Sequence, residues 1–361
     1  SIPSLTTRSS YESGSNENVH ELTLQHVNLG NAPGYVKHTQ RRVQAGRSGY
    51  MNSNNSRIET IMDKRLGALS ATALAVILAG CSSGSDAPDT GSLSLSVSDG
   101  PVHDAIEVCL EFDEVELKKV GSPPLTITDL TLQQVNLLNY QGTNSAPLFM
   151  DIEVEAGEYQ WVRLGVNAIR NGSGGQGTPD PMYSAGCTYD GSYVLFGEEE
   201  LASPYNAYVP SGAQSGLQIN GPFVVAQGGA TRMTAEFDLE KTLTEPPGLD
   251  GDIVVRPSIR LVNDLEVGAV TGTVSTDLLG PLDEMTGAPL DCEPTVYVFE
   301  DGVGPTMLTA ADSIASAIVS NDANPDVYEY TVGFLLPGDY DLAFTCDGVT
   351  FDEGIGDATI L

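Results

Sequence analysis

A run of small and aliphatic residues in this chain ends at a cysteine and is followed by a short polar tract. Leu66–Leu78 contains no charge, the basic stretch Met62-Asp63-Lys64-Arg65 precedes it, and Leu78-Ala79-Gly80-Cys81 closes it. Cations before such a segment hold its start on one side of a membrane while the segment inserts, and its length is too short to span a bilayer comfortably. The Cys81 thiol would then stand where an acyl group can be attached.

This order of parts resembles the signal peptide of bacterial lipoproteins, in which the cysteine accepts a diacylglycerol. The resemblance implies that residues 62–80 are a signal peptide, that Cys81 is lipidated, and that the protein lies in the cell envelope. Ser82 rather than aspartate follows the cysteine, which favours the outer membrane, facing the periplasm or the surface. Residues 81–90 are predicted to be a flexible tether. The alternative is a short buried helix followed by an ordinary cysteine.

Residues 1–61 lie upstream of the start expected at Met62. They are polar, rich in Asn, Ser and Arg, and have no hydrophobic period. They are therefore predicted to be disordered and to precede the true start of translation.

Acidic side chains dominate the remainder of the chain. Eight of the 16 Lys and Arg residues and five of the 49 Asp and Glu residues precede Cys81, which leaves a formal charge near −36 on the rest. Such a chain repels nucleic acid and anionic lipid surfaces. It would attract cations, including calcium, unless its charge serves solubility alone.

Four further cysteines are expected to form disulfides, because an exported protein meets an oxidising compartment. Four cysteines allow three connectivities. A domain boundary near residue 264 places two cysteines on each side, and this favours Cys109–Cys187 and Cys292–Cys346. Each bridge would contribute about 4 kcal/mol in the chain-entropy description. Four free thiols or a zinc site are weaker readings, because the sequence has no Cys-x-x-Cys pair.

The usual catalytic motifs are missing from the sequence, and we expect no enzyme activity. His103 is the single histidine after Cys81, and no Gly-x-Ser-x-Gly or Gly-Lys pair occurs. Gly172–Gly177 has the spacing of a dinucleotide-binding loop. However, two prolines in Thr178–Pro181 prevent the helix that would hold the pyrophosphate.

Carboxylates in several turns are the candidate metal ligands. Calcium takes several oxygen ligands from loops, and no other cofactor is expected. None of the turns has the spacing of an EF-hand, and Asp also caps ordinary turns. The candidate calcium ligands are Asp99, Asp104, Asp250, Asp252, Asp322 and Asp326.

The chain after Gly91 reads as β structure throughout. Ile106, Val108, Leu110 and Phe112 alternate with polar residues, which is the period of a half-buried strand and directs Cys109 to the opposite face. Many short strands separated by Gly- and Pro-rich turns predict an antiparallel β-sandwich over residues 91–264. A second, smaller β-sandwich is predicted over residues 265–361. Thr309–Ser320 within it is expected to form a short helix, because Thr309 and Asp312 have capping-box spacing.

Two segments share a pattern of an apolar strand end, a glycine turn and a tyrosine that opens the next strand. They are Val154–Tyr159 and Leu335–Tyr340. Glycine permits positive φ at such turns, so the pattern is read as structural. Trp161, on the strand that follows the first segment, is expected to lie in the core.

Five segments of the first β region occur in a characteristic order: Gly91–Pro101, Val115–Leu117, Ala156–Leu164, Phe237–Leu243 and Arg256–Val262. Through them the region, over about Gly91–Val262, resembles the bacterial lipoprotein domains catalogued as domain of unknown function 4382. No catalytic residue is implied by that resemblance. Through Leu336-Pro337-Gly338-Asp339-Tyr340, the region after Gly268 is weakly similar to small prealbumin-like or carboxypeptidase-regulatory-like β domains.

These features favour a lipid-anchored, non-catalytic binding or structural protein of the envelope. Its partners would be the membrane, through the lipid, and a glycan or an envelope protein, with no nucleic acid. The alternative is a calcium-dependent carbohydrate-binding surface lipoprotein. Exposed aromatic rings for sugar stacking would then come from Tyr183, Tyr189, Tyr193, Tyr205 and Tyr208.

Overall fold

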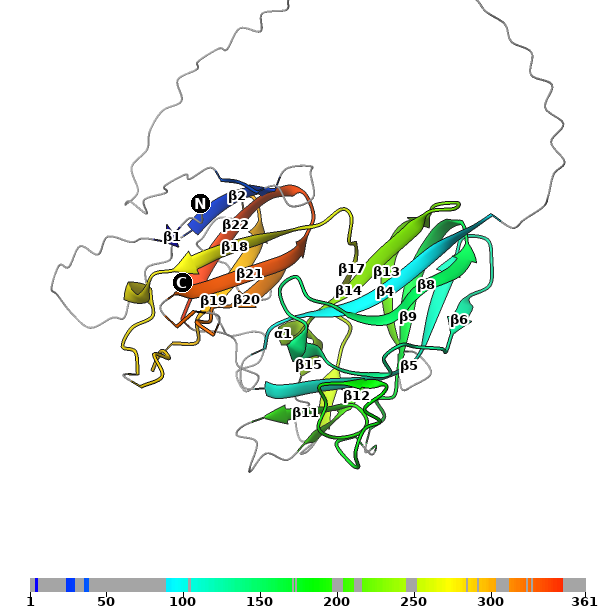
Figure 1. Ribbon diagram of the computed structural model, residues 1–361, viewed down its shortest axis with the longest axis horizontal. Helices are drawn as coiled ribbons and strands as arrows, with labels where there is room; N and C mark the ends of the chain where they lie inside the picture. Colours follow the sequence, from blue (N-terminus) through cyan, green and yellow to red (C-terminus); the bar gives the residue numbers. More distant parts are fainter. Residues whose placement is uncertain are drawn as a thin grey trace, which may run out of the picture. The chain divides into compact units, whose positions relative to one another are not determined.

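The described part of the chain forms β-sheets around two separate apolar cores, here called the first and second modules, with almost no helix (Figure 1). In the computed structural model, the described residues are 4–5, 24–29, 36–38, 89–102, 105–170, 172, 174–196, 204–210, 216–244, 252–283, 285–290, 292–302, 312–322, 324–325 and 327–346. The part of the chain in these ranges contains no helix long and apolar enough to cross a membrane.

One sheet of the first module has four strands. Its order is β17 (Ile259–Asn263), β14 (Ala230–Asp238), β4 (Thr90–Gly100) and β8 (Ala146–Glu155). The serines of β4 alternate with buried Leu93, Leu95 and Val97, so one face of the sheet supplies core residues.

The second sheet of this module is organised by the long strand β5 (Ala105–Lys119). One half of β5 pairs with β9 (Gly157–Val166) and β6 (Leu125–Ile127). The other half pairs with β7 (Gln134–Asn136) and β11 (Tyr193–Phe196). The remaining strands are β10 (Ser184–Ala185), β12 (Tyr205–Tyr208), β13 (Leu217–Val225), β15 (Leu243–Thr244) and β16 (Asp252–Val255).

A single apolar core joins the two sheets of the first module. Val108, Leu110 and Phe112 of β5 contribute to it, and all three are almost completely buried. The predicted alternation along β5 is confirmed at these three positions and is wrong at Ile106, which is exposed, while Glu107 and Cys109 on the opposite face are also buried. The all-β sandwich class is confirmed.

The prediction of an antiparallel sandwich is wrong for three strand pairs of the first module, which are the short pairs β7–β10 and β12–β16 and one long pair. Strands β4 and β14 run parallel, from Ala230 opposite Ser92 to Asp238 opposite Gly100. A parallel pair needs a long connection rather than a tight hairpin, and more than a hundred residues separate these two strands. Nearby, Arg256-Pro257-Ser258 separates β16 from β17.

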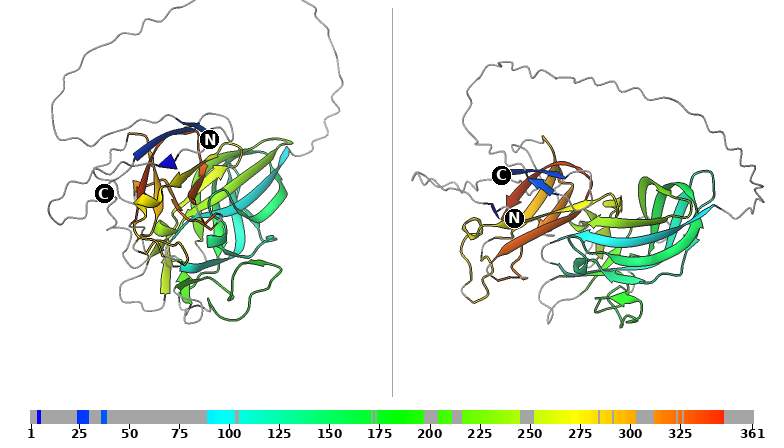
Figure 2. Two further views of the ribbon diagram at one scale, coloured as in Figure 1. Left: turned by 60° about the vertical axis from the view of Figure 1, so that its left-hand side comes forward. Right: turned by 45° about the horizontal axis from the view of Figure 1, so that its top comes forward.

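The second module also has two sheets, and Figure 2 shows their strands from two further directions. β18 (Gly268–Val274) pairs with β21 (Tyr328–Leu335), and β19 (Thr295–Glu300) lies between β20 (Ala315–Ile318) and β22 (Gly338–Thr345). Val270, Val298, Val332 and Leu342 share its core with other side chains from both sheets. The turn residues between Asn263 and Gly268 separate β17 of the first module from β18.

The predicted helix over Thr309–Ser320 is wrong where the structure describes it. Residues 315–318 form β20, in which Ala315 and Ala317 are buried and Ser316 lies between them. This is the period of a strand, and pairing with β19 overrides the capping-box signal.

Three short strands lie within the upstream region that was expected to be disordered. They are β1 (Ser4–Leu5), β2 (Leu24–Leu29) and β3 (Val36–His38). β1 pairs with β18, and β2 extends the second module's other sheet beyond β22. The structure differs from the expectation in these segments because sheet edges offer unpaired backbone groups to any extended chain.

The two glycine-turn segments have the same tyrosine hydrogen bond. The hydroxyl of Tyr159 donates to the carbonyl oxygen of Glu155 at 2.8 Å, and that of Tyr340 donates to the carbonyl oxygen of Leu336 at 2.6 Å. Gly157 in the first turn has φ of 137°, which a side chain would strain. The tyrosine hydrogen bond thus recurs in each module, whereas the positive φ expected at the glycine is found at Gly157 and not at Gly338.

We predict that Tyr159→Phe and Tyr340→Phe each lower the free energy of unfolding by about 0.5–1.5 kcal/mol, because each removes one part-buried hydrogen bond. Urea unfolding monitored by circular dichroism measures the effect. Tyr183→Phe, at an exposed tyrosine, is the matched control and should change little. Equal effects of all three substitutions would contradict the assignment.

Candidate functional site

Several of the residues predicted to have a chemical role lie outside the described part of the chain. Cys81 and its signal-peptide context are among them, as are His103 and three of the six candidate calcium ligands. The three are Asp104, Asp250 and Asp326.

Both predicted disulfides are present. Cys109 on β5 is bonded to Cys187, and Cys292 before β19 is bonded to Cys346 after β22. Cys109 is completely buried on the face of β5 opposite the main core, where it packs with Tyr193 and Leu195. The alternation along β5 therefore placed this cysteine correctly, and the bridge fastens a loop to the outer face of the sheet.

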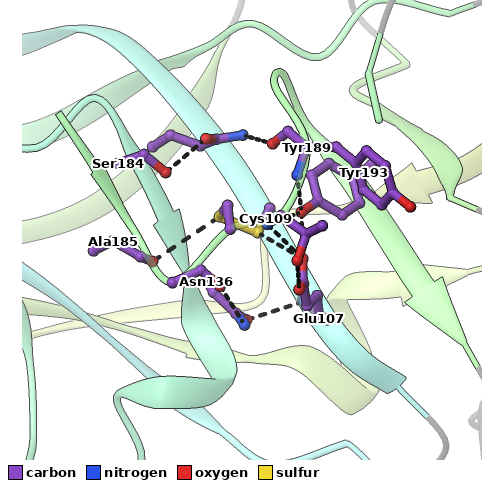
Figure 3. The surroundings of a disulfide bond; sticks show 12 residues. Glu107, Cys109, Asn136, Ser184, Ala185, Tyr189 and Tyr193 are labelled. Carbon is purple, nitrogen blue, oxygen red and sulfur yellow. Dashed lines mark hydrogen bonds between the residues drawn. A yellow bond between two sulfur atoms is a disulfide. The ribbon is translucent and has the colours of Figure 1, made fainter. Parts of the chain in front are cut away.

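A polar network surrounds the Cys109–Cys187 bridge (Figure 3). Glu107 accepts hydrogen bonds from the Thr188 amide at 3.1 Å, from the Thr188 hydroxyl at 2.5 Å and from the Tyr193 hydroxyl. The Tyr193 hydroxyl in turn accepts from the amides of Thr188 and Tyr189. Burial and the bond to Glu107 raise the pKa of Tyr193 far above its ordinary value. The carboxylate of Glu107 thus organises the loop after Cys187.

Two buried amides on β7 hold the same loop from its other side. Gln134 donates to the carbonyl oxygens of Tyr189 and Gly191, and it accepts from the hydroxyl of Ser184. Asn136 donates to the carbonyl oxygen of Gly186 and accepts from the Val108 amide. The buried side-chain oxygens and nitrogens of Glu107, Gln134, Asn136 and Tyr193 all have hydrogen-bond partners. A network of this kind holds a loop in one conformation, so its role is structural.

The three described calcium candidates do not come together. Asp252 on β16 accepts from Asn206 at 3.2 Å, and Arg170 lies 3.9 Å from it. Asp322 is exposed on a turn of the second module, whereas Asp99 is buried at the end of β4. Among the residues that the structure describes, no three acidic, histidine or cysteine side chains are grouped so that they could hold a metal ion.

The aromatic residues proposed for sugar stacking are only partly available. Tyr193 and Tyr208 are buried, which overturns their assignment as exposed rings, whereas Tyr183 and Tyr205 are exposed. The expectation that Trp161 is a core residue is also wrong. It is half-buried, and the guanidinium of Arg163 lies over its ring at 4.8 Å from the ring centre. A bulge in β9 shifts the alternation that placed it inside.

The unexpected site is a cluster of buried carboxyl groups where β4, β14 and the short helix α1 (Leu239–Thr242) meet. Asp99 is 3 % exposed, and neither of its carboxyl oxygens has a hydrogen-bond partner among the described residues. Glu236, Asp238 and Glu240 all act on it electrostatically. Such a group is costly to bury in its charged form.

Burial also dominates the titration of the other two buried carboxyls in this cluster. It raises the pKa of Glu236 to about 7, although the charge of Arg260 opposes the change. It raises the pKa of Glu240 to about 8, and the charge of Asp238 adds to the change. Burial likewise raises the pKa of Asp99 well above its ordinary value, and the charges of Asp238, Glu236 and Glu240 add to the change. The Leu239 backbone N–H has the smallest effect and opposes the rise, although it does not meet the geometry of a hydrogen bond.

Two cations lie in the cluster. Lys241 makes an ion pair with Asp238 at 2.8 Å, and Arg260 on β17 makes an ion pair with Glu236. Asp238 also accepts from the backbone amide of Lys241, as the N-cap of α1. Four carboxyl groups therefore share two basic side chains.

Residues of the second module contact this same cluster. The hydroxyl of Tyr297 on β19 donates to Glu240 at 3.2 Å, and Lys241 donates to the Ser313 carbonyl oxygen at 2.6 Å. Arg260 donates to the carbonyl oxygen of Phe334 at 3.4 Å. The cluster is thus the polar part of the contact between the two modules.

Close backbone packing accompanies these polar contacts. A side chain at Gly333 on β21 would collide with the backbone of Gly142 in the first module. Strand β19 is buried along Thr295–Phe299, with Val296 and Val298 in the second module's own core and Tyr297 on the opposite face. The sequence signal for this contact is the continuous run of apolar and aromatic residues Val296–Phe299, which predicts a strand covered on both faces.

Fold and site together define a disulfide-bonded, all-β protein with two sandwich-like modules and a carboxyl-rich contact between them. In a comparison with family models, residues 90–257 of the first module match the family described as "Domain of unknown function (DUF4382)". Asp99, Glu236, Asp238, Glu240 and Lys241 lie in the matched region, which agrees with the resemblance noted in the sequence. No curated protein and no solved structure matches the chain.

We predict that Glu107→Gln lowers the free energy of unfolding by about 1–3 kcal/mol, because it weakens three hydrogen bonds to one buried carboxylate. Guanidinium unfolding at neutral pH measures the change. Glu158→Gln, at an exposed carboxylate on β9, is the matched control and should be close to neutral. If both variants unfold at the wild-type midpoint, Glu107 does not hold the loop.

Proposed function

We propose that this protein is a lipid-anchored component of the bacterial cell envelope, in the outer membrane, and that its β modules bind or brace another envelope component without catalysis. Lipidation of Cys81 would fix the chain to the membrane. The polar stretch after it would hold the modules away from the lipid surface.

The observation that carries the proposal is the pair of disulfides, one in each module. Disulfides persist in oxidising compartments outside the cytosol and are rare within it. Their presence supports export, and the sequence before Cys81 supplies the signal that export to the envelope would require. Neither observation alone specifies an anchor, but they converge on one compartment.

The nature of the partner is constrained by charge. The residues after Cys81 carry a formal charge near −36, so they repel nucleic acid and anionic membrane surfaces. A neutral glycan or a protein with a basic or neutral surface suits such a chain. The satisfied polar network at the Cys109–Cys187 bridge supports a rigid module, which is what a binding or bracing role uses.

We predict that Cys81→Ala abolishes lipid attachment and moves the protein from the membrane fraction to the soluble fraction. The full chain would be expressed in a Gram-negative bacterium supplied with an alkyne-tagged fatty acid, and the tag would be detected after gel separation. Ser82→Ala, which leaves the thiol in place, is the matched control and should remain labelled.

Intact-mass measurement of the purified wild-type protein provides the second readout. The expected mass is that of a chain beginning at Cys81 with attached acyl groups and two disulfides. An untagged wild-type protein in the soluble fraction, or a Cys81→Ala variant that keeps the tag, would overturn the proposal.

A further inference from the structure

The carboxyl cluster between the modules carries more negative charge than its surroundings can neutralise. Among the described residues, Lys241 and Arg260 are the cations that pair with the group Asp99, Glu236, Asp238 and Glu240, so two negative charges would remain if every one of these groups were ionised. Asp99 is the extreme member, because both of its oxygens are buried and lack a hydrogen-bond partner among the described residues. A buried carboxyl group in this position is stable only when it is neutral.

We propose that the contact between the two β modules is a proton-binding site, in which protons taken up by the carboxyl cluster neutralise it and allow the modules to dock. Loss of those protons at alkaline pH loosens the contact. The proton is the ligand, and the second module is the part whose docking it controls.

The groups that face the cluster come from every element packed against it. β4 contributes Asp99, and β14 contributes Glu236 and Asp238. α1 contributes Glu240 and Lys241, and β17 contributes Arg260. From the second module come the Tyr297 hydroxyl, the carbonyl oxygens of Ser313 and Phe334, and no cation among the described contacts.

The second module therefore removes water from the cluster without supplying a positive charge. Tyr297 is completely buried and Glu240 is 5 % exposed where their hydrogen bond forms. A carboxylate keeps its charge in water at little cost, whereas a buried charge is penalised by desolvation. The hydrogen bond from Tyr297 favours the charged form of Glu240, but burial has the larger effect on its pKa. Docking and proton uptake are for this reason linked, and each favours the other.

The direction of the pH dependence follows from the raised pKa values. The pKa of Glu236 rises from 4.5 to about 7, and that of Glu240 rises from 4.5 to about 8. The folded, docked state therefore holds more protons than the unfolded chain between these values. The contribution of these two protonated groups to the stability of the folded state is therefore complete below about pH 4.5. It is lost as the pH rises through about 7 and about 8.

The test compares urea unfolding of the purified full chain at about pH 5 and at about pH 9, on either side of the raised values. The wild type should lose at least about tenfold in its folding equilibrium constant between the two conditions. Glu240→Gln and Asp99→Asn should each reduce that loss, because the amide stays neutral at both values. Asp129→Asn, at an exposed carboxylate, is the matched control and should keep the wild-type dependence.

A second readout reports docking itself. Amide hydrogen exchange of β19 and α1, corrected for the intrinsic effect of pH, should become faster at alkaline pH in the wild type and not in Glu240→Gln. Carbon-detected NMR titration of the wild type should find carboxyl groups that titrate near pH 7 and near pH 8. This measurement decides the matter even if Asp99→Asn does not fold.

Two results would overturn the proposal. In the first, the wild type and both cluster variants lose the same stability between the two pH values. In the second, calcium chloride at alkaline pH restores the wild type but not Asp99→Asn, which would make a metal ion the neutralising ligand. A role for this proton-linked contact in the cell envelope rests on the proposed function. The unfolding experiment does not depend on that function, because its result is the same whether or not Cys81 is lipidated.

Discussion

Desolvation of carboxyl groups is the constraint around which the contact between the modules is arranged. Asp99, Glu236 and Glu240 are buried at the ends of β4 and β14 and on α1, where water no longer screens them. Burying one unpaired carboxylate costs several kcal/mol, which is a large part of a domain's net stability. Lys241, Arg260 and Tyr297 offset part of this cost, and protonation is the means that remains for the rest.

The polar network at the Cys109–Cys187 bridge is the opposite solution to the same problem. Glu107 is also buried, but it accepts three hydrogen bonds from Thr188 and Tyr193. A fully satisfied network rigidifies the loop that it holds, whereas an unsatisfied carboxyl such as Asp99 makes its surroundings sensitive to conditions. The first module thus contains one buried carboxyl group, Glu107, with hydrogen-bond partners and another, Asp99, that has none among the described residues.

Many strands of this fold could be predicted from the sequence because apolar and polar residues alternate along them, as in β4. The period along β5 placed Val108 in the core and Cys109 on the opposite face, and division of the cysteines between two β regions gave both bridges. The sequence signals failed where a distant partner decided the outcome. Ala315–Ile318 pairs with β19 despite a helix-capping pattern, and β4 finds a parallel partner in β14 that no local signal indicates.

The carboxyl cluster could not be predicted in the same way. The sequence favours a turn residue or a calcium ligand at Asp99. Nothing near Asp99 in the sequence indicates that the 236–240 segment lies beside it. Parallel pairing of β4 with β14 brings Asp99 opposite Phe237 and Gly100 opposite Asp238, so the acidic groups meet only after the sheet has formed. Counting charges along a sequence shows that a chain is acidic, but it does not show which carboxyl groups are buried next to one another.

The division of the cluster between matched and unmatched regions has a physical consequence. The four carboxyl groups and Lys241 lie within residues 90–257, whereas Arg260, Tyr297 and Ser313 lie beyond them. A first module without its neighbour would leave Glu240 without the hydroxyl of Tyr297 and open to water, where an ionised carboxylate is cheap. The second module buries these groups and gives one hydroxyl to Glu240, while its two carbonyl oxygens accept hydrogen bonds from Lys241 and Arg260 rather than from the acids. Docking therefore favours the neutral form of these acids by its own geometry, and proton affinity becomes a property of the pair of modules rather than of either one.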